Sequence, residues 1–433
     1  MYGELHDGRR PPAAKHGNLR RAFAIHLALG AACGHAPGTL TKPAAADDGV
    51  AQLEAELRAS PANGAVIYAL AMRHDRLGHV TEALAWLEQL AGTPWDAGVD
   101  PTDFVNSRAR AAARYDAARI AIEQRWVQAP RAKERVRISE RDLLPEGMER
   151  DPGSGELLLS SGRKRKVVRV APDGTTRDVV APGQDGLLAT LGLRVDGARG
   201  LLWVANAAAP FMEHADDTPP GTSRLHAFEL ATGRLRARYE LPGPSLLNDV
   251  VVLPDGRAVV TDSAASGLWI TGEGRLEPLL PAGTLSDPNG LVLSASGDLL
   301  YVATWRGIAV VDWRARRAAP LQLPAGATNL AGIDGLYLHA GALVGIQNAV
   351  GRPRVVRLPL AEGGRGAIRV DVIESGSVIV DNPTTGVVVD GELVFLARRN
   401  RERAFAPGAA APGALEEIVV AAVSLTGAGR SAR

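Results

Sequence analysis

The sequence has little of three things that often mark a function class, namely cysteine, aromatic residues and net charge. Its one cysteine, Cys33, excludes an intrachain disulfide framework and a cysteine metal cluster. Only 4% of the 433 residues are aromatic, which argues against base stacking on nucleic acid. The net charge of +1 gives no strong field toward nucleic acid or an anionic membrane. What remains is ordinary globular composition, in a chain long enough for two or three domains.

The sequence also lacks an apolar run long enough to span a bilayer, so we predict no transmembrane segment. The nearest candidate, AFAIHLALGAA, follows Arg20-Arg21 and ends in small residues just before Cys33. A charged start and a short apolar middle are typical of a secretory signal. We therefore interpret residues 1–45 as a signal-like or disordered amino terminus and predict export to the periplasm, with a lipid anchor at Cys33 as one form. The alternative is a disordered amino terminus on a cytoplasmic protein.

Residues 46–132 predict a small helical region. They are rich in Ala, Leu, Arg and Glu and show apolar residues at helical spacing, interrupted at Leu77-Gly78. Five residues follow the small and large pattern of a tetratricopeptide helix pair: Leu70, Leu77, Gly78, Ala83 and Leu84. One such pair cannot build a long solenoid, because stacked neighbours bury each unit's apolar face. We expect it to pack on the next domain or to offer a small surface to a protein partner.

From residue 134 onward, short β-rich runs alternate with turn dipeptides, and one pattern of strand, tight turn and strand recurs six times. The copies begin at residues 146, 191, 248, 289, 334 and 385. Their spacing of 41 to 57 residues suits a four-stranded propeller blade. We predict an all-β six-bladed β-propeller over residues 134–433, in which RVRIS (135–139) and EEIVVAAVSL (416–425) complete one blade together.

The register of the repeat brings polar residues to one place. The innermost strands of a propeller line a central channel, so the first residues of the copies converge at its mouth: Glu146, Leu191, Asn248, Asn289, Asp334 and Thr385. Two carboxylates and two amides there form an oxygen-rich cage that a cation would neutralise. Without His or Cys, the set favours calcium, magnesium or manganese. Taken singly, the same residues could be ordinary turn residues.

At these residues the chain resembles the gluconolactonase, regucalcin and luciferin-regenerating enzyme family of six-bladed propellers. The resemblance covers residues 140–400 and rests on four ordered motifs: PEGMERDPGSGELLLSS, NDVVVLPDGRAVVTDS, PNGLVLSASGDLLYVA and IDGLYLHAGALVGIQN. It implies one divalent metal ion, calcium first, with magnesium, manganese or zinc as alternatives. The implied ligands are Glu146, Asn248, Asn289 and Asp334, with Asp334 also as the catalytic base.

Sugar-lactone hydrolases of this family carry an arginine just before the first Asn motif, where this chain has Leu246 and Leu247. This difference argues against an aldonolactone and favours a more apolar substrate. We expect Asn248, Leu247 and Thr385 to contact the substrate.

Two functions follow from these observations. The first is a metal-dependent hydrolase of a small-molecule lactone or ester, in which the cation polarises the carbonyl and Asp334 activates water. The second is a binding or scaffold protein, in which the propeller holds a structural ion and the helical region docks a partner. Condensation chemistry of the strictosidine synthase type ranks third, because no glutamate base is evident in the later repeats.

Overall fold

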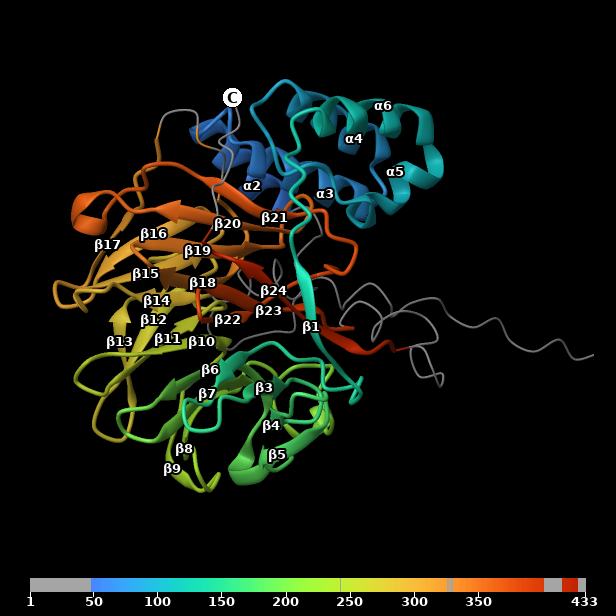
Figure 1. Ribbon diagram of the computed structural model, residues 1–433. Helices are drawn as coiled ribbons and strands as arrows, with labels where there is room; N and C mark the ends of the chain where they lie inside the picture. The colour runs from blue at the N-terminus through green and yellow to red at the C-terminus, as the bar shows by residue number, and fades with distance from the viewer. Residues whose placement is uncertain (1–47, 242, 325–326, 328–329, 401–414, 427–433) are drawn as a thin grey trace, which may run out of the picture.

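The computed structural model describes residues 48–241, 243–324, 327, 330–400 and 415–426. These residues form a β-propeller with a cluster of helices at one end (Figure 1). The predicted amino-terminal segment, including Cys33, lies outside the described residues.

The propeller consists of six four-stranded antiparallel sheets in the described part of the chain, as the repeat predicted. The first three blades are β2–β5 (Met148–Arg150, Leu157–Ser161, Lys166–Val170, Thr176–Val180), β6–β9 (Ala189–Asp196, Leu201–Ala207, Ser223–Glu229, Leu235–Glu240) and β10–β13 (Leu247–Val252, Ala258–Asp262, Gly267–Thr271, Leu276–Leu280). The fourth and fifth are β14–β17 (Leu291–Leu293, Leu299–Thr304, Gly307–Asp312, Arg317–Pro320) and β18–β21 (Ile333–His339, Ala342–Gln347, Arg354–Pro359, Asp371–Ser375).

The sixth blade closes the ring with strands from both ends of the propeller. It contains β22 (Gly386–Val389), β23 (Glu392–Arg398), β24 (Ile418–Ser424) and, as its outermost strand, β1 (Lys133–Ile138). Strand β1 pairs antiparallel with β24, with Ile138 opposite Ile418. This confirms the predicted closure. Closure gives every blade a neighbour on both faces, so that only the short inner and outer edges of the sheets are left.

The helical region precedes β1 and consists of α2 (Asp48–Ala59), α3 (Gly64–Leu77), α4 (Val80–Ala91), α5 (Val105–Arg110) and α6 (Ala112–Glu123). Helix α3 ends where the sequence predicted, because Gly78 adopts a left-handed φ of 80° as its C-cap. The pair α3 and α4 packs closely, while its tetratricopeptide-like character stays a prediction. No helix among the described residues is both long and apolar enough to cross a membrane.

The helices share a hydrophobic core with the propeller. Buried Tyr68 and Trp95 of the helical region belong to the same core as Ala331 and Val350 of blade five, and Trp305 of blade four packs against it. The three propeller residues lie in loops at the end of the blades where the inner strands begin. The helical region therefore covers part of the face that carries the predicted site (Figure 1).

The helical region contains a half-buried acid, Asp103, that makes stability depend on pH. Asp103 accepts a hydrogen bond from the Tyr68 hydroxyl at 2.7 Å. Burial and then the charge of Asp100 raise the pKa of Asp103 to about 7. The unfolded chain loses this proton near pH 3.9, so the free energy of unfolding falls as the pH rises from about 4 to about 7.

We expect Asp103→Asn to remove this slope and to be more stable than the wild type at pH 8 by about 2 kcal/mol, a value reduced for partial solvent exposure. An amide can still accept the Tyr68 hydrogen bond, so the substitution keeps that contact. The measurement is urea denaturation between pH 4 and 8, with the exposed Asp116→Asn as the control. Parallel pH curves for Asp103→Asn and the wild type would refute this account.

Candidate functional site

The starts of the inner strands meet closely around the channel. Gly290 N donates to Asp334 O at 3.0 Å, and Gly335 N donates to Thr384 O at 3.0 Å, so neighbouring blades are hydrogen-bonded there. A Cβ at position 290 would lie 2.2 Å from Asp334 O, so only glycine fits this approach. The glycines at 290 and 335 therefore allow neighbouring blades to approach closely. The residues just before them, Asn289 and Asp334, lie at the end of the ring where the inner strands begin.

A repeated left-handed turn leads into four of these strand starts. Leu144, Asp287, Gly332 and Asn382 have φ of 48°, 47°, 69° and 54°, each two residues before a polar side chain of the channel mouth. Such a φ is uncommon for residues other than glycine and occurs often where function requires a fixed geometry. In three of the turns the next residue is proline, as the sequence shows at 145, 288 and 383.

Glu146 and Asp334, far apart in the sequence, meet at one hydroxyl. Thr384 Oγ1 donates to Asp334 Oδ2 at 2.6 Å and lies 3.5 Å from Glu146 Oε2. Asn348 Nδ2 also donates to Asp334 Oδ2, at 2.8 Å, and to Pro383 O at 2.6 Å. The Asp334 carboxylate is thus held by an amide and a hydroxyl from two different blades.

A buried arginine pairs with Glu146. Arg399 follows β23, is 3% exposed, and its Nη1 contacts Glu146 Oε2. Asn382 holds the same guanidinium, because Arg399 Nη2 donates to Asn382 Oδ1 at 2.9 Å. The guanidinium of Arg399 thus supplies positive charge beside the carboxylates of Glu146 and Asp334, which lowers the free-energy cost of removing them from water.

The two predicted amide residues lie on the same ring of strand starts. Asn248 Nδ2 donates to Ser263 Oγ at 3.0 Å, and Ser263 Oγ donates to Pro288 O at 2.7 Å, directly before Asn289. Asn289 lies one residue before Gly290, whose amide is bonded to Asp334 O. Glu146 and Asp334 are joined through a single side chain, whereas Asn248 and Asn289 are linked to the site through Ser263 and the backbone.

The structure corrects the substrate contact predicted for Leu247. Its side chain is 0% exposed and packs in the core between blades two and three, with Trp203 and Leu225. The physical reason is strand alternation, since successive side chains point to opposite faces. Leu246, next to it, is half-buried at the start of the strand.

Thr385 lies one residue from the position that meets the carboxylates. Its hydroxyl is 3.1 Å from that of the buried Tyr337, while Thr384 contacts Glu146 and Asp334. The prolines could have revealed this register, because Pro145-Glu146 and Pro288-Asn289 align with Pro383-Thr384.

Three other residues of the site were missed because the sequence was read only at the first strand of each repeat. Ser263, Asn348 and Arg399 all follow the second strand of their repeats directly. An antiparallel hairpin brings the end of its second strand beside the start of its first. The polar endings of those strands, TDS, IQN and LARR, were the available signal.

A second set of charges lies farther along the inner strands β2, β6 and β10. Arg194 Nη1 contacts Glu149 Oε1 at 2.8 Å, and Arg194 Nε donates to Val250 O at 3.2 Å. Asp249, in the position that is glycine in several other repeats, accepts from Leu291 N at 3.1 Å with Oδ2. Burial raises the pKa of Glu149 to about 6 against the opposing charge of Arg194. Burial also raises the pKa of Asp249.

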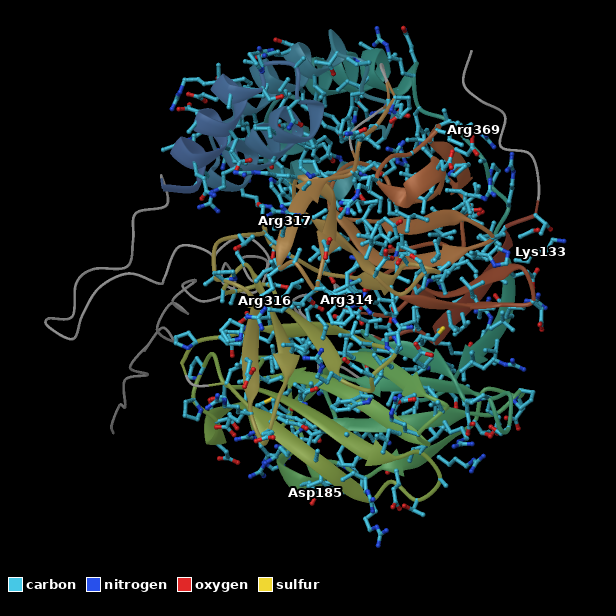
Figure 2. The ribbon with its side chains drawn as sticks, turned by 90° about the vertical axis from the view of Figure 1, so that its left-hand side faces the viewer. Lys133, Asp185, Arg314, Arg316, Arg317 and Arg369 are labelled. Atoms are coloured by element: carbon cyan, nitrogen blue, oxygen red, sulfur yellow. The ribbon has the colours of Figure 1, made fainter. Side chains whose placement is uncertain are left out.

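The charged side chains of Glu149, Arg194 and Asp249 are inside the propeller, whereas charged side chains usually lie on the protein surface. Lys133 and Asp185, for example, lie at the periphery of the molecule (Figure 2). A third acid lies near the mouth. Asp287 comes two residues before Asn289, and burial and then the charge of Asp334 raise the pKa of Asp287 to about 7. The channel mouth is therefore acidic, with Arg399 as its paired cation.

The donor types at the mouth fit a hard divalent cation. Carboxylate and amide oxygens are the ligands that calcium and magnesium prefer. Among the described residues, no group of three or more His, Cys, Asp and Glu side chains is arranged to hold a metal. The predicted set would therefore need its two amides, Asn248 and Asn289, as well as Glu146 and Asp334.

A cavity of about 310 Å³ lies elsewhere, between the helices and blade four. Trp95, Arg306 and Leu330 are among its lining residues, and none of the four predicted metal ligands is.

The insertion between β7 and β8 packs on the site-bearing face beside blade one, where Glu213 N donates to Arg163 O at 2.8 Å. Its position is that of a rim loop.

No protein-family model and no curated protein matches the chain. Solved structures similar to it include a gluconolactonase from Xanthomonas campestris, with 15% identity and a TM-score of 0.42 over 69% of this chain and 86% of that one. A calcium-binding regucalcin from Agrobacterium tumefaciens has 17% identity and a TM-score of 0.47 over 69% and 97%. A luciferin-regenerating enzyme has 13% identity and a TM-score of 0.45 over 69% and 96%. The three proteins named from the sequence are thus among the similar structures, and the likeness is one of fold.

Proposed function

We propose that this protein is a hydrolase of a lactone or ester that works with one divalent cation at the channel mouth. The observation that carries the proposal is the meeting of Glu146 and Asp334 at the Thr384 hydroxyl. Glu146 and Asp334 are half-buried, and two such carboxylates are costly to hold together unless cations compensate them. The Arg399 guanidinium offsets one of the two negative charges. A divalent cation held by carboxylate and amide oxygens would offset the other.

The ligands in this proposal are Glu146, Asn248, Asn289 and Asp334, with calcium as the first choice of ion. When bound, such an ion would polarise the substrate carbonyl. Asp334 takes the proton from the attacking water, since its carboxylate is already oriented by Thr384 and Asn348. Arg399 keeps Glu146 in place and adds a fixed positive charge where negative charge develops on the substrate.

The substrate in this proposal is more apolar than a sugar lactone. Half-buried Leu246 lies beside Asn248 at the start of β10, where the sugar-lactone hydrolases that the sequence resembles carry arginine. Leu247 is excluded from this role by its burial. An aliphatic lactone would place its chain on Leu246 and its carbonyl oxygen toward the cation that the carboxylates and amides would hold.

The direct test of this function is hydrolysis of a panel of aliphatic and sugar lactones by the purified protein. We expect turnover of aliphatic members, loss of activity on treatment with a chelator, and recovery on addition of calcium. Turnover that survives complete removal of divalent ions would rule out the role of the cation. Absence of turnover across the panel, together with calcium binding, would favour the scaffold alternative.

A second expectation concerns metal content. We expect the purified wild type to hold about one equivalent of divalent metal and Glu146→Gln to hold much less, because the amide loses the charge that attracts the ion. Elemental analysis after dialysis against calcium measures this. Glu156→Gln, in the turn between β2 and β3 at the other end of the same blade, is the matched control and should keep the wild-type content. Equal metal in all three proteins would remove Glu146 from the ligand set.

The scaffold function keeps one observation in its favour. Val105 and Ile120 of the helical region are 62% and 55% exposed, unlike most large apolar side chains described. Apolar side chains on a surface can serve a protein partner. Calcium-dependent stability without hydrolysis would support this alternative.

A further inference from the structure

A short loop joins the carboxylate of Asp334 to the helical region. Strand β19 ends at Gln347, and the next residue, Asn348, donates to Asp334 Oδ2 at 2.8 Å. Two residues later, Val350 is 0% exposed and belongs to the hydrophobic core of the helices. The chain therefore passes from the site to the helical core within three residues.

The helical region fixes this loop through its backbone. Arg352 N donates to Ala97 O at 2.7 Å. Gly351 has a φ of 72°, and a Cβ there would lie 2.6 Å from Ala97 O. The loop thus lies against the 97–99 segment so closely that position 351 admits only glycine.

Side chains reinforce the same attachment. Arg352 Nη2 contacts Glu123 Oε1 of α6 at 2.5 Å, and its guanidinium lies 4.4 Å from the centre of the Trp126 ring. Arg354, at the far end of the loop, contacts Asp96 at 2.8 Å and Gln347 at 2.7 Å. The second half of the loop, Arg352 to Arg354, is therefore held by contacts with Ala97, Glu123 and Asp96 that exist only when the helices are docked.

We propose that the helical region is a positioning element for the site: by holding loop 348–354 it sets Asn348 against Asp334 and thereby fixes the direction of that carboxylate. Asn348 is the positioning residue. A general base displaced by about 1 Å can lose about a hundredfold in rate, so such support has a large effect for a small movement. The inference deepens the proposed hydrolase function and rests on it for its kinetic consequence, while its structural part stands without it.

The experiment compares two variants that act on the loop with a matched control. Asn348→Ala removes the contact with Asp334, and Arg352→Met weakens the attachment to α6 while keeping the length of the side chain. Arg306→Met is the control, because Arg306 also bridges propeller and helices, contacting Glu56 at 3.0 Å, but lies outside the loop. Each full-length variant is crystallised and assayed on the lactone panel.

We expect the Asp334 carboxylate to be turned or divided between two positions in Asn348→Ala and Arg352→Met, and unchanged in Arg306→Met. In the assay, kcat should fall about tenfold or more in the first two variants, with KM within about twofold. An Asp334 side chain that keeps its place in Arg352→Met, or that moves equally in Arg306→Met, overturns the inference. If the wild type hydrolyses nothing, the proposed function fails, and the crystal structures alone still decide the positioning role.

Discussion

Asp334→Asn is expected to lower kcat for lactone hydrolysis by about a hundred- to ten-thousand-fold, the usual effect of removing a general base. The amide cannot take a proton from water, although it is nearly the same size and can still accept from Thr384 and Asn348. The change should therefore act on the chemical step and leave the fold intact. Steady-state kinetics with saturating calcium measures it.

The control for this substitution is Asp390→Asn, at an exposed turn of blade six. It makes the same chemical change away from the channel and should keep kcat within about twofold of the wild type, as expected for surface positions. If Asp334→Asn retained comparable activity, water activation would have to be assigned to another group. Asp287, which is close enough to Asp334 for their charges to interact, would be the first to examine.

Asp96→Ala is expected to lower the free energy of unfolding by about 3–5 kcal/mol, because it leaves a buried guanidinium without its carboxylate. Arg354 is 1% exposed and contacts Asp96 Oδ1 at 2.8 Å. Its Nη2 already lacks a partner in the described part of the chain, so the ion pair with Asp96 carries most of the compensation. Urea denaturation followed by tryptophan fluorescence measures the loss.

The matched control is Glu88→Ala, which breaks the ion pair of Glu88 with Arg114 within the helical region. Both of those side chains are more than two-fifths exposed, so its removal should cost less than about 1 kcal/mol. Similar losses in Asp96→Ala and Glu88→Ala would show that the buried pair adds nothing beyond a surface pair. If only the unfolding transition of the helical region shifted in Asp96→Ala, the effect would lie at the surface where the helices contact the propeller.

The number of blades and the way the ring closes could be predicted from the sequence. Both follow from local chemistry, since alternating apolar residues and turn dipeptides define hairpins, and six copies at blade-length spacing leave little freedom. The sequence also predicted equivalent positions for Glu146 and Asp334, because residues at the same position of a repeat occupy the same place in their blades. The end of helix α3 at Gly78 could also be predicted, because glycine tolerates the left-handed conformation of a helix C-cap.

The side chains that complete the site, and the helices that cover it, could not be predicted in this way, because they are brought together by long-range packing. Arg399 pairs with Glu146 because blade six closes against blade one, and no local pattern encodes a contact between the two ends of a ring. Leu247 was predicted to contact the substrate, but its side chain is buried in the core, because successive side chains of a strand point to opposite faces. The attachment of loop 348–354 to the helices depends on long-range packing, which the sequence of either part does not determine.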